Sequence, residues 1–167
     1  MTIGEKAIRL IELCKEQGLF VSTAESCTGG LISAAITDVA GSSAVFDRAF
    51  VTYSNEAKAQ MLGVPIEHTV SPGAVSDLVA REMVDGALEN SRADIAVAVT
   101  GIAGPGGGSD EKPVGLVYVA VKARDGIPKV LECRFADQGH HSRSDIRAAT
   151  VNTALAELIA LAGSIEG

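Results

Sequence analysis

The stretch ADIAVAVTGIAGPGGG, residues 93–108, joins an apolar strand candidate to a glycine-rich segment. Its first eight residues, 93–100, form a nearly continuous apolar run, as expected for a strand that is buried on both faces of a sheet. The glycine-rich segment 101–113 follows at once and cannot be regular structure. A buried strand that ends in such a loop is typical of open α/β sheets, which bind ligands beyond the carboxyl ends of their strands.

Helical and strand patterns alternate along the rest of the chain. Apolar residues at helical spacing predict five helices, over residues 2–17, 28–40, 55–62, 76–90 and 142–161. Apolar and β-branched runs predict five strands, over residues 19–25, 44–54, 93–100, 114–123 and 129–136. The last two strands are expected to form a hairpin around 124–128, and 63–73 is predicted to be a loop. This order predicts an α/β fold, a three-layer α/β/α sandwich with a mixed central sheet.

Composition limits the classes of function. The 167 residues fit a single domain, 1–167, with 47% hydrophobic and 21% charged residues. A formal net charge of -7 argues against a nucleic-acid partner. No apolar run approaches the roughly 20 residues that span a bilayer, and the first residues do not resemble a signal peptide. We therefore expect a cytoplasmic protein without a membrane partner.

The three cysteines are scattered along the chain and lack metal-ligand spacing. Cys14 and Cys133 fall in phase with apolar neighbours and are predicted to be core residues. We expect neither a bound metal nor a disulfide.

The motif TAESCTGG, residues 23–30, places two candidate nucleophiles at a strand-to-helix turn. Backbone N–H groups at a helix N-terminus can stabilise an alkoxide, a phosphate or an oxyanion, although Ser26 or Thr28 could also serve only as an N-cap. Adjacent residues that leave a strand point to opposite sides, and cysteine is often buried. We therefore predict that Ser26 is the nucleophile and that Cys27 packs inward.

A serine nucleophile needs a base, and the motif TYSNEAK, residues 52–58, offers one. No histidine lies in a motif that marks it as a triad partner. Lys58 could serve if burial lowers the pKa of its amine from about 10.4 toward 7–8. Tyr53 could then relay a proton or orient the amine. The alternative is a surface lysine that pairs with a nearby acid.

Two further stretches could hold an anionic ligand. The loop 101–113 lacks the ending of a P-loop and the phase of a dinucleotide fingerprint, so its position after the buried strand is its main signal. In HSRSDIR, residues 141–147, Arg143 and Arg147 lie one turn apart at a helix start, where cations oppose the dipole and each other. A phosphate between them would resolve this conflict, and Asp145 could instead offset part of it.

Four stretches together, AESCTGG, VTYSNEAK, GAVS and VTGIAGPGGGSDEKPVG, resemble the CinA carboxy-terminal-domain family. Stand-alone members of that family include nicotinamide-nucleotide amidohydrolases, which convert nicotinamide mononucleotide (NMN) to nicotinic acid mononucleotide and ammonia. The resemblance covers nearly the whole chain. One departure is HSR at 141–143, where the family often reads GDR, so the loop 138–142 differs.

The resemblance implies a metal-free amidase that needs no cofactor and takes a small-molecule substrate, NMN. It assigns the roles of nucleophile, base and assisting hydroxyl to Ser26, Lys58 and Tyr53. It further implies substrate contacts by Glu25, Thr28, Gly29, Gly30, Asn55, Gly101, Gly104, Arg143 and Arg147. A homo-oligomer, a dimer, is expected.

Two classes of function remain open at this point. The first is an NMN amidohydrolase, and the second is a non-catalytic nucleotide-binding or protein-interaction module that keeps the pocket. The presence of both Ser26 and Lys58 favours the enzyme, because binding alone needs neither a nucleophile nor a neutral amine.

Overall fold

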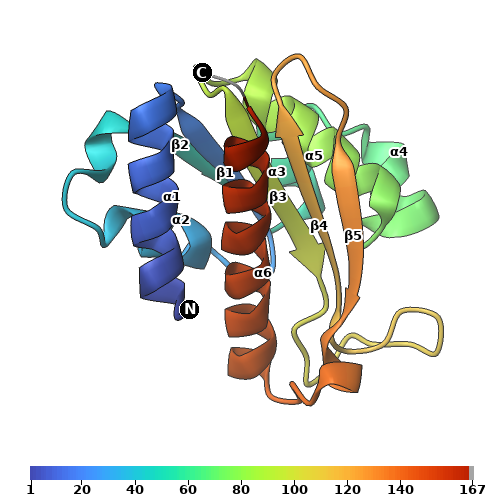
Figure 1. The fold of residues 1–167 in the computed structure, drawn as a ribbon. Helices are drawn as coiled ribbons and strands as arrows, with labels where there is room; N and C mark the ends of the chain where they lie inside the picture. The colour runs from blue at the N-terminus through green and yellow to red at the C-terminus, as the bar shows by residue number, and fades with distance from the viewer. Residues whose placement is uncertain (166–167) are drawn as a thin grey trace.

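The computed structural model describes residues 1–165 and contains one five-stranded sheet between two layers of helices (Figure 1). The strands are β1 (Val21–Glu25), β2 (Phe46–Val51), β3 (Ile95–Gly101), β4 (Leu116–Ala123) and β5 (Lys129–Arg134), in the order β2-β1-β3-β4-β5. The pairs β1–β2 and β1–β3 are parallel, whereas β3–β4 and β4–β5 are antiparallel. The predicted three-layer α/β/α sandwich with a mixed sheet is confirmed.

One face of the sheet carries α1 (Ile3–Gln17), α2 (Leu31–Thr37) and α6 (Arg143–Ser164), and the other carries α3 (Asn55–Leu62), α4 (Ile66–His68) and α5 (Asp77–Glu89). In Figure 1, α1 and α6 stand in front of the sheet and α5 behind it. The side chains of β3 divide between the layers accordingly. Ile95, Val97 and Val99 join the core under α1 and α6, whereas Ala96 and Ala98 join the core under α5.

Local sequence signals explain where several helices begin and end. Thr2 and Glu5 form a reciprocal capping box at the start of α1, and Gly18 ends that helix in the left-handed conformation, with φ of 68°. On the opposite layer α3 and α5 approach closely. A Cβ added at Gly86 would lie 2.1 Å from the backbone oxygen of Leu62, so only glycine fits at this contact.

Several predicted boundaries are wrong, each for a local reason. The second helix begins at Leu31 rather than 28, because Gly29 and Gly30 are both left-handed. The predicted loop 63–73 contains α4 and a wide helical turn, Thr69–Gly73, with Pro65 at the N-cap of α4. The strand predicted over 44–54 spans only Phe46–Val51, and the strand predicted over 129–136 ends at Arg134 before a 3-10 turn.

The helix α6 runs to Ser164, beyond its predicted end, and by length and composition alone it is long and apolar enough to cross a membrane. The sequence holds no uninterrupted apolar run of that length, because Arg147 and Glu157 lie within this helix. In this fold the apolar residues of α6, among them Ile146, Leu155 and Leu158, are buried against the sheet and α1.

Candidate active site

A cavity of about 230 Å³ lies at the carboxyl ends of β1 and β3. Among its walls are six of the residues predicted from the sequence: Ser26, Tyr53, Asn55, Lys58, Gly101 and Arg143. They come from four separate segments: three lie at the carboxyl ends of the parallel strands β1, β2 and β3, and the fourth is the start of α6, with Arg143. The cavity is not lined by the other six predicted residues: Glu25, Thr28, Gly29, Gly30, Gly104 and Arg147.

Lys58 is the most unusual side chain of the site, because only 1% of it is exposed. It lies on the buried face of α3, one turn before Leu62, and Ser54 caps the start of this helix. Its Nζ lies 2.9 Å from Ser26 Oγ, 2.8 Å from the Thr52 carbonyl oxygen and 3.2 Å from the Tyr53 carbonyl oxygen. No carboxylate pairs with this amine among the described residues.

Burial lowers the pKa of Lys58 from its ordinary value of 10.5 to about 8. A neutral amine has two N–H groups and one lone pair. The carbonyl oxygens of Thr52 and Tyr53 can only accept, so in the neutral state they take the two N–H groups. The lone pair is then left for the Ser26 hydroxyl, which donates its proton along the 2.9 Å contact. This is the geometry of a serine beside its general base.

Cys27 borders the cavity but differs from Ser26 in its electrostatics. Its side chain belongs to the core under α6, and burial raises the pKa of the thiol to about 11. A thiol with this pKa is protonated near neutral pH and is a poor nucleophile. Cys14 and Cys133 are buried, as predicted.

Glu25 holds the turn that presents Ser26. Its side chain is fully buried, and its carboxylate accepts hydrogen bonds from Thr28 Oγ1 at 2.7 Å and from the backbone N–H groups of Ile32 at 2.9 Å and Ser33 at 3.0 Å. An acceptor with a negative charge suits the start of α2, where N–H groups lack partners within the helix. Glu25 and Thr28 therefore bond to each other and stabilise the turn. The sequence had predicted that both residues contact the substrate.

Replacing Glu25 with glutamine is expected to lower the free energy of unfolding by about 2 kcal/mol, because the amide group would turn a donor toward one of these N–H groups or toward Thr28. Denaturant unfolding would measure the change. Glu16→Gln makes the same substitution at an exposed position of α1 and should leave stability unchanged. Equal stability of the two variants would contradict the role given to Glu25.

The two arginines of α6 have different surroundings. Arg147 donates from Nε to the Cys27 carbonyl at 3.1 Å and from Nη2 to the Thr28 carbonyl at 3.0 Å. Two carbonyl oxygens therefore take two of its five N–H donors and lie against the cation near the helix start. Gly29 belongs to the same turn, since a Cβ there would lie 3.5 Å from Arg147 Nη2. Arg147 thus connects α6 to the turn that follows Ser26.

Arg143 is exposed at the mouth of the cavity. It donates to the Gly104 carbonyl oxygen at 2.6 Å and to the Tyr53 hydroxyl at 3.0 Å. The Tyr53 side chain is 61% exposed, so its hydroxyl lies at the entrance, while its carbonyl oxygen contacts Lys58 inside. Gly104 reaches the site only through this carbonyl.

Five residues of the cavity wall were not predicted from the sequence to line a site: Cys27, which was expected to pack inward, and Ala74, Val75, Thr100 and Ala103. Thr100 could have been predicted as a site residue, because it is a polar residue at the carboxyl end of an otherwise apolar strand. Ala74 and Val75 follow the helical turn Thr69–Gly73 and line the cavity. The sequence predicted only a loop at 63–73, so the position of these two residues could not be predicted.

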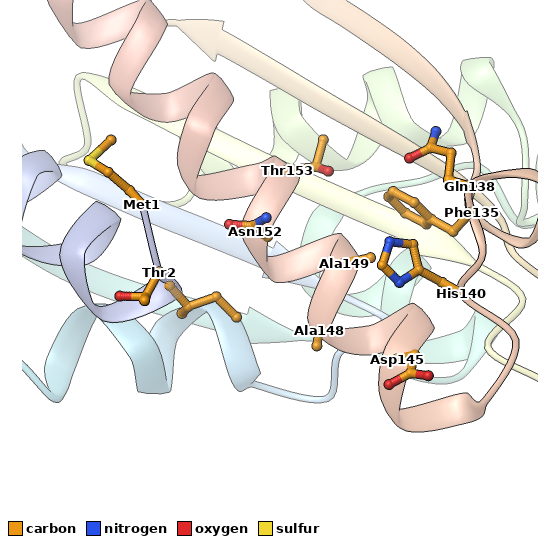
Figure 2. Close-up of a pocket in the computed structure, with 11 residues that line it drawn as sticks. Met1, Thr2, Phe135, Gln138, His140, Asp145, Ala148, Ala149, Asn152 and Thr153 are labelled. Carbon is orange, nitrogen blue, oxygen red and sulfur yellow. The ribbon is translucent and has the colours of Figure 1, made fainter.

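A larger hollow of about 320 Å³ lies elsewhere, between the N-terminus of α1, α6 and the turn that follows β5 (Figure 2). His140 and Phe135 pack edge-to-face in its wall, with ring centroids 6.0 Å apart. We place the active site in the smaller cavity because it alone of the two holds a buried serine bonded to a lysine. Within residues 1–165, no group of three His, Cys, Asp or Glu side chains could hold a metal ion.

A mixed α/β sandwich with a buried serine–lysine pair at the carboxyl edge of its sheet has relatives of known structure. The crystal structure of the competence/damage inducible protein CihA from Agrobacterium tumefaciens matches with a TM-score of 0.92 at 60% identity, over 95% of this chain and 94% of that one. The family model for the CinA C-terminal domain matches residues 5–162. The chain belongs to the CinA C-terminal domain family.

Curated relatives fall into two kinds. The nicotinamide-nucleotide amidohydrolase PncC of Enterobacter agglomerans is 47% identical over 94% of this chain and 96% of its own length, and the enzyme of the same name from Escherichia coli K12 is 62% identical over 64% of each chain. A putative competence-damage inducible protein of Caldicellulosiruptor bescii is 56% identical over 76% of this chain. The chain matches only about a third of the length of longer relatives of this second kind, from 31% to 33%.

Proposed function

We propose that this protein hydrolyses the carboxamide of NMN to nicotinic acid mononucleotide and ammonia, without a metal, through Ser26 and Lys58. The observation that carries the proposal is the 2.9 Å contact between a buried serine hydroxyl and a buried amine with a pKa of about 8. Burial of an amine is unfavourable because the charged form loses its hydration, and a module that only binds a ligand does not need a neutral amine. The PncC relatives support the choice of substrate.

In the first step, neutral Lys58 takes the proton of the Ser26 hydroxyl while Oγ attacks the carboxamide carbon. The tetrahedral oxyanion would be stabilised by the backbone N–H of Cys27, for which no backbone acceptor is found among residues 1–165. The Lys58 ammonium then gives its proton to the departing nitrogen. The C–N bond breaks, ammonia leaves, and an ester joins the acyl group to Ser26.

In the second step, Lys58 takes a proton from water and the resulting hydroxide attacks the ester carbon. The C–O bond to Ser26 breaks, and the Lys58 ammonium returns its proton to Oγ. The acid product leaves, and the neutral amine and the serine hydroxyl are restored. One lysine therefore serves both half-reactions as base and as acid.

The mouth of the cavity fits the phosphate end of the substrate. A volume of about 230 Å³ is below the roughly 300–1,000 Å³ of most ligand pockets, so the pyridine carboxamide would fill it while the ribose phosphate lies across the entrance. Arg143 stands there with an exposed guanidinium, and Asn55 adds a polar wall. We assign the phosphate contact to Arg143 and not to Arg147, because Arg143 is exposed and lines the cavity, whereas Arg147 is half-buried and does not line it.

Ammonia release in the presence of a chelator tests this function. NMN should be hydrolysed and free nicotinamide should react far more slowly. Arg143→Ala should raise KM for NMN about tenfold or more and change the reaction of nicotinamide little, since only NMN loses a phosphate contact. Arg9→Ala removes an exposed arginine of α1 and is the matched control. Equal rates for NMN and nicotinamide would contradict the phosphate contact, and loss of activity with the chelator would contradict metal independence.

A further inference from the structure

Thr100 is a buried residue of the active-site wall, and its hydroxyl group has no role in the reaction proposed above. It follows Val99 in β3, just as Ser26 follows Glu25 in β1, and the parallel register pairs Glu25 with Val99. The side chains of Thr100 and Ser26 also lie on the same face of the sheet, two residues beyond the register partners Ala98 and Ala24, both of which pack in the core under α5. The two hydroxyl-bearing residues are therefore neighbours at the edge of the sheet.

The Thr100 hydroxyl has a fixed direction. It donates its single proton to the carbonyl oxygen of Ala74 at 2.9 Å, and a carbonyl oxygen cannot donate in return. The side chain is 1% exposed, so bulk water does not compete for this proton. Both residues line the cavity that contains Ser26 and Lys58. Toward a ligand in that cavity, Thr100 Oγ1 offers only lone pairs.

We propose that Thr100 Oγ1 accepts a hydrogen bond from the NH₂ group of the bound carboxamide and thereby selects the amide substrate over the acid product. A carboxamide carries two N–H donors, whereas a carboxylate carries only acceptors. The contact that holds the substrate would place oxygen against oxygen once the amide has become an acid. A site built around one polar contact discriminates strongly against a ligand that cannot make it. The inference rests on the proposed amidase function.

This arrangement also orders the reacting group. With the amide nitrogen held at Thr100, the carbonyl carbon can face Ser26 and its oxygen the N–H of Cys27. The departing nitrogen then stays near the edge of the sheet where Lys58 returns its proton. Loss of ammonia removes the donor that Thr100 bonds, so the same side chain favours release of the product.

The test compares Thr100→Val, which keeps the shape and removes the hydroxyl, with Thr100→Ser, which keeps the hydroxyl. Both are measured for KM with NMN and for the inhibition constant Ki of nicotinic acid mononucleotide. We expect Thr100→Val to lower the ratio of Ki to KM about tenfold or more, while Thr100→Ser stays within about threefold of the unsubstituted protein. Thr150→Val is the matched control, since Thr150 is equally buried and donates to the Ile146 carbonyl away from the cavity.

An unchanged ratio, with KM and Ki either unaltered or changed by the same factor, would show that Thr100 only supports the wall through Ala74 and would overturn the proposal. If Thr100→Val does not fold, Thr100→Ala gives the same comparison. Failure of the unsubstituted protein to release ammonia from NMN would instead reject the amidase function. The two failures are therefore distinguishable.

Discussion

Ser26→Ala is expected to reduce kcat for ammonia release from NMN by at least about 10³-fold, because among residues 1–165 no other hydroxyl bonds the amine of Lys58. The fold should persist, since the substitution removes one oxygen atom and leaves Lys58 bonded to the carbonyl groups of Thr52 and Tyr53. Ammonia release and thermal unfolding, measured on the same preparation, would separate loss of chemistry from loss of structure.

The neighbouring cysteine supplies the matched control. Cys27→Ala removes a buried thiol whose pKa of about 11 keeps it protonated, so most of the activity should remain. Its buried sulfur contributes to the core under α6, and we expect a loss of stability of about 1 kcal/mol. An active Ser26→Ala protein together with an inactive Cys27→Ala protein would reverse the assignment of the nucleophile.

Lys58→Arg should be nearly inactive although it keeps the positive charge. A guanidinium stays protonated at any pH that the protein tolerates and cannot act as a base. In the unsubstituted protein the reactive form is the neutral amine, so kcat/KM should rise with pH and level off above the pKa of about 8. At pH 7 about a tenth of the amines are neutral, and a rise of roughly tenfold is expected between pH 7 and the plateau.

The pH profile distinguishes a base from a structural cation. A lysine that acted only through its charge would give a rate that falls as the pH passes 8. A Lys58→Arg protein with a near-normal kcat, or a flat profile between pH 6 and 9, would contradict the role of Lys58. Lys6→Arg offers a control, because that lysine bonds the side chain of Asn152 away from the cavity.

Much of the fold could be predicted because the periodic patterns were strong. The residues of β3 are apolar on both faces since both faces are covered, and this burial placed the strand in the middle of the sheet. The predicted ends of helices and strands were wrong where the backbone conformation, and not the hydrophobic pattern, determines where an element begins or ends. The left-handed glycines 29 and 30 delay the start of α2, and the segment from Pro65 to Gly73 forms helical turns despite its Pro and Gly residues.

The candidate site divides in the same way. Ser26, Lys58, Tyr53 and Arg143 could be grouped from the sequence because their motifs together resemble one family, and all four line the same cavity. The direction of a polar side chain could not be predicted. Glu25, Thr28 and Arg147 come from the same motifs, yet their hydrogen bonds go to the backbone and side chains of the turn itself, which only the tertiary structure reveals.

If Ser26 forms an acyl intermediate, turnover of NMN in the presence of hydroxylamine will reveal it. An ester on Ser26 can be attacked by either water or hydroxylamine. We expect the hydroxamate to appear at the expense of nicotinic acid mononucleotide, in proportion to the hydroxylamine concentration, while their sum equals the ammonia released from the substrate. Release of ammonia with no hydroxamate at any hydroxylamine concentration would mean direct attack by water and would contradict the Ser26–Lys58 mechanism.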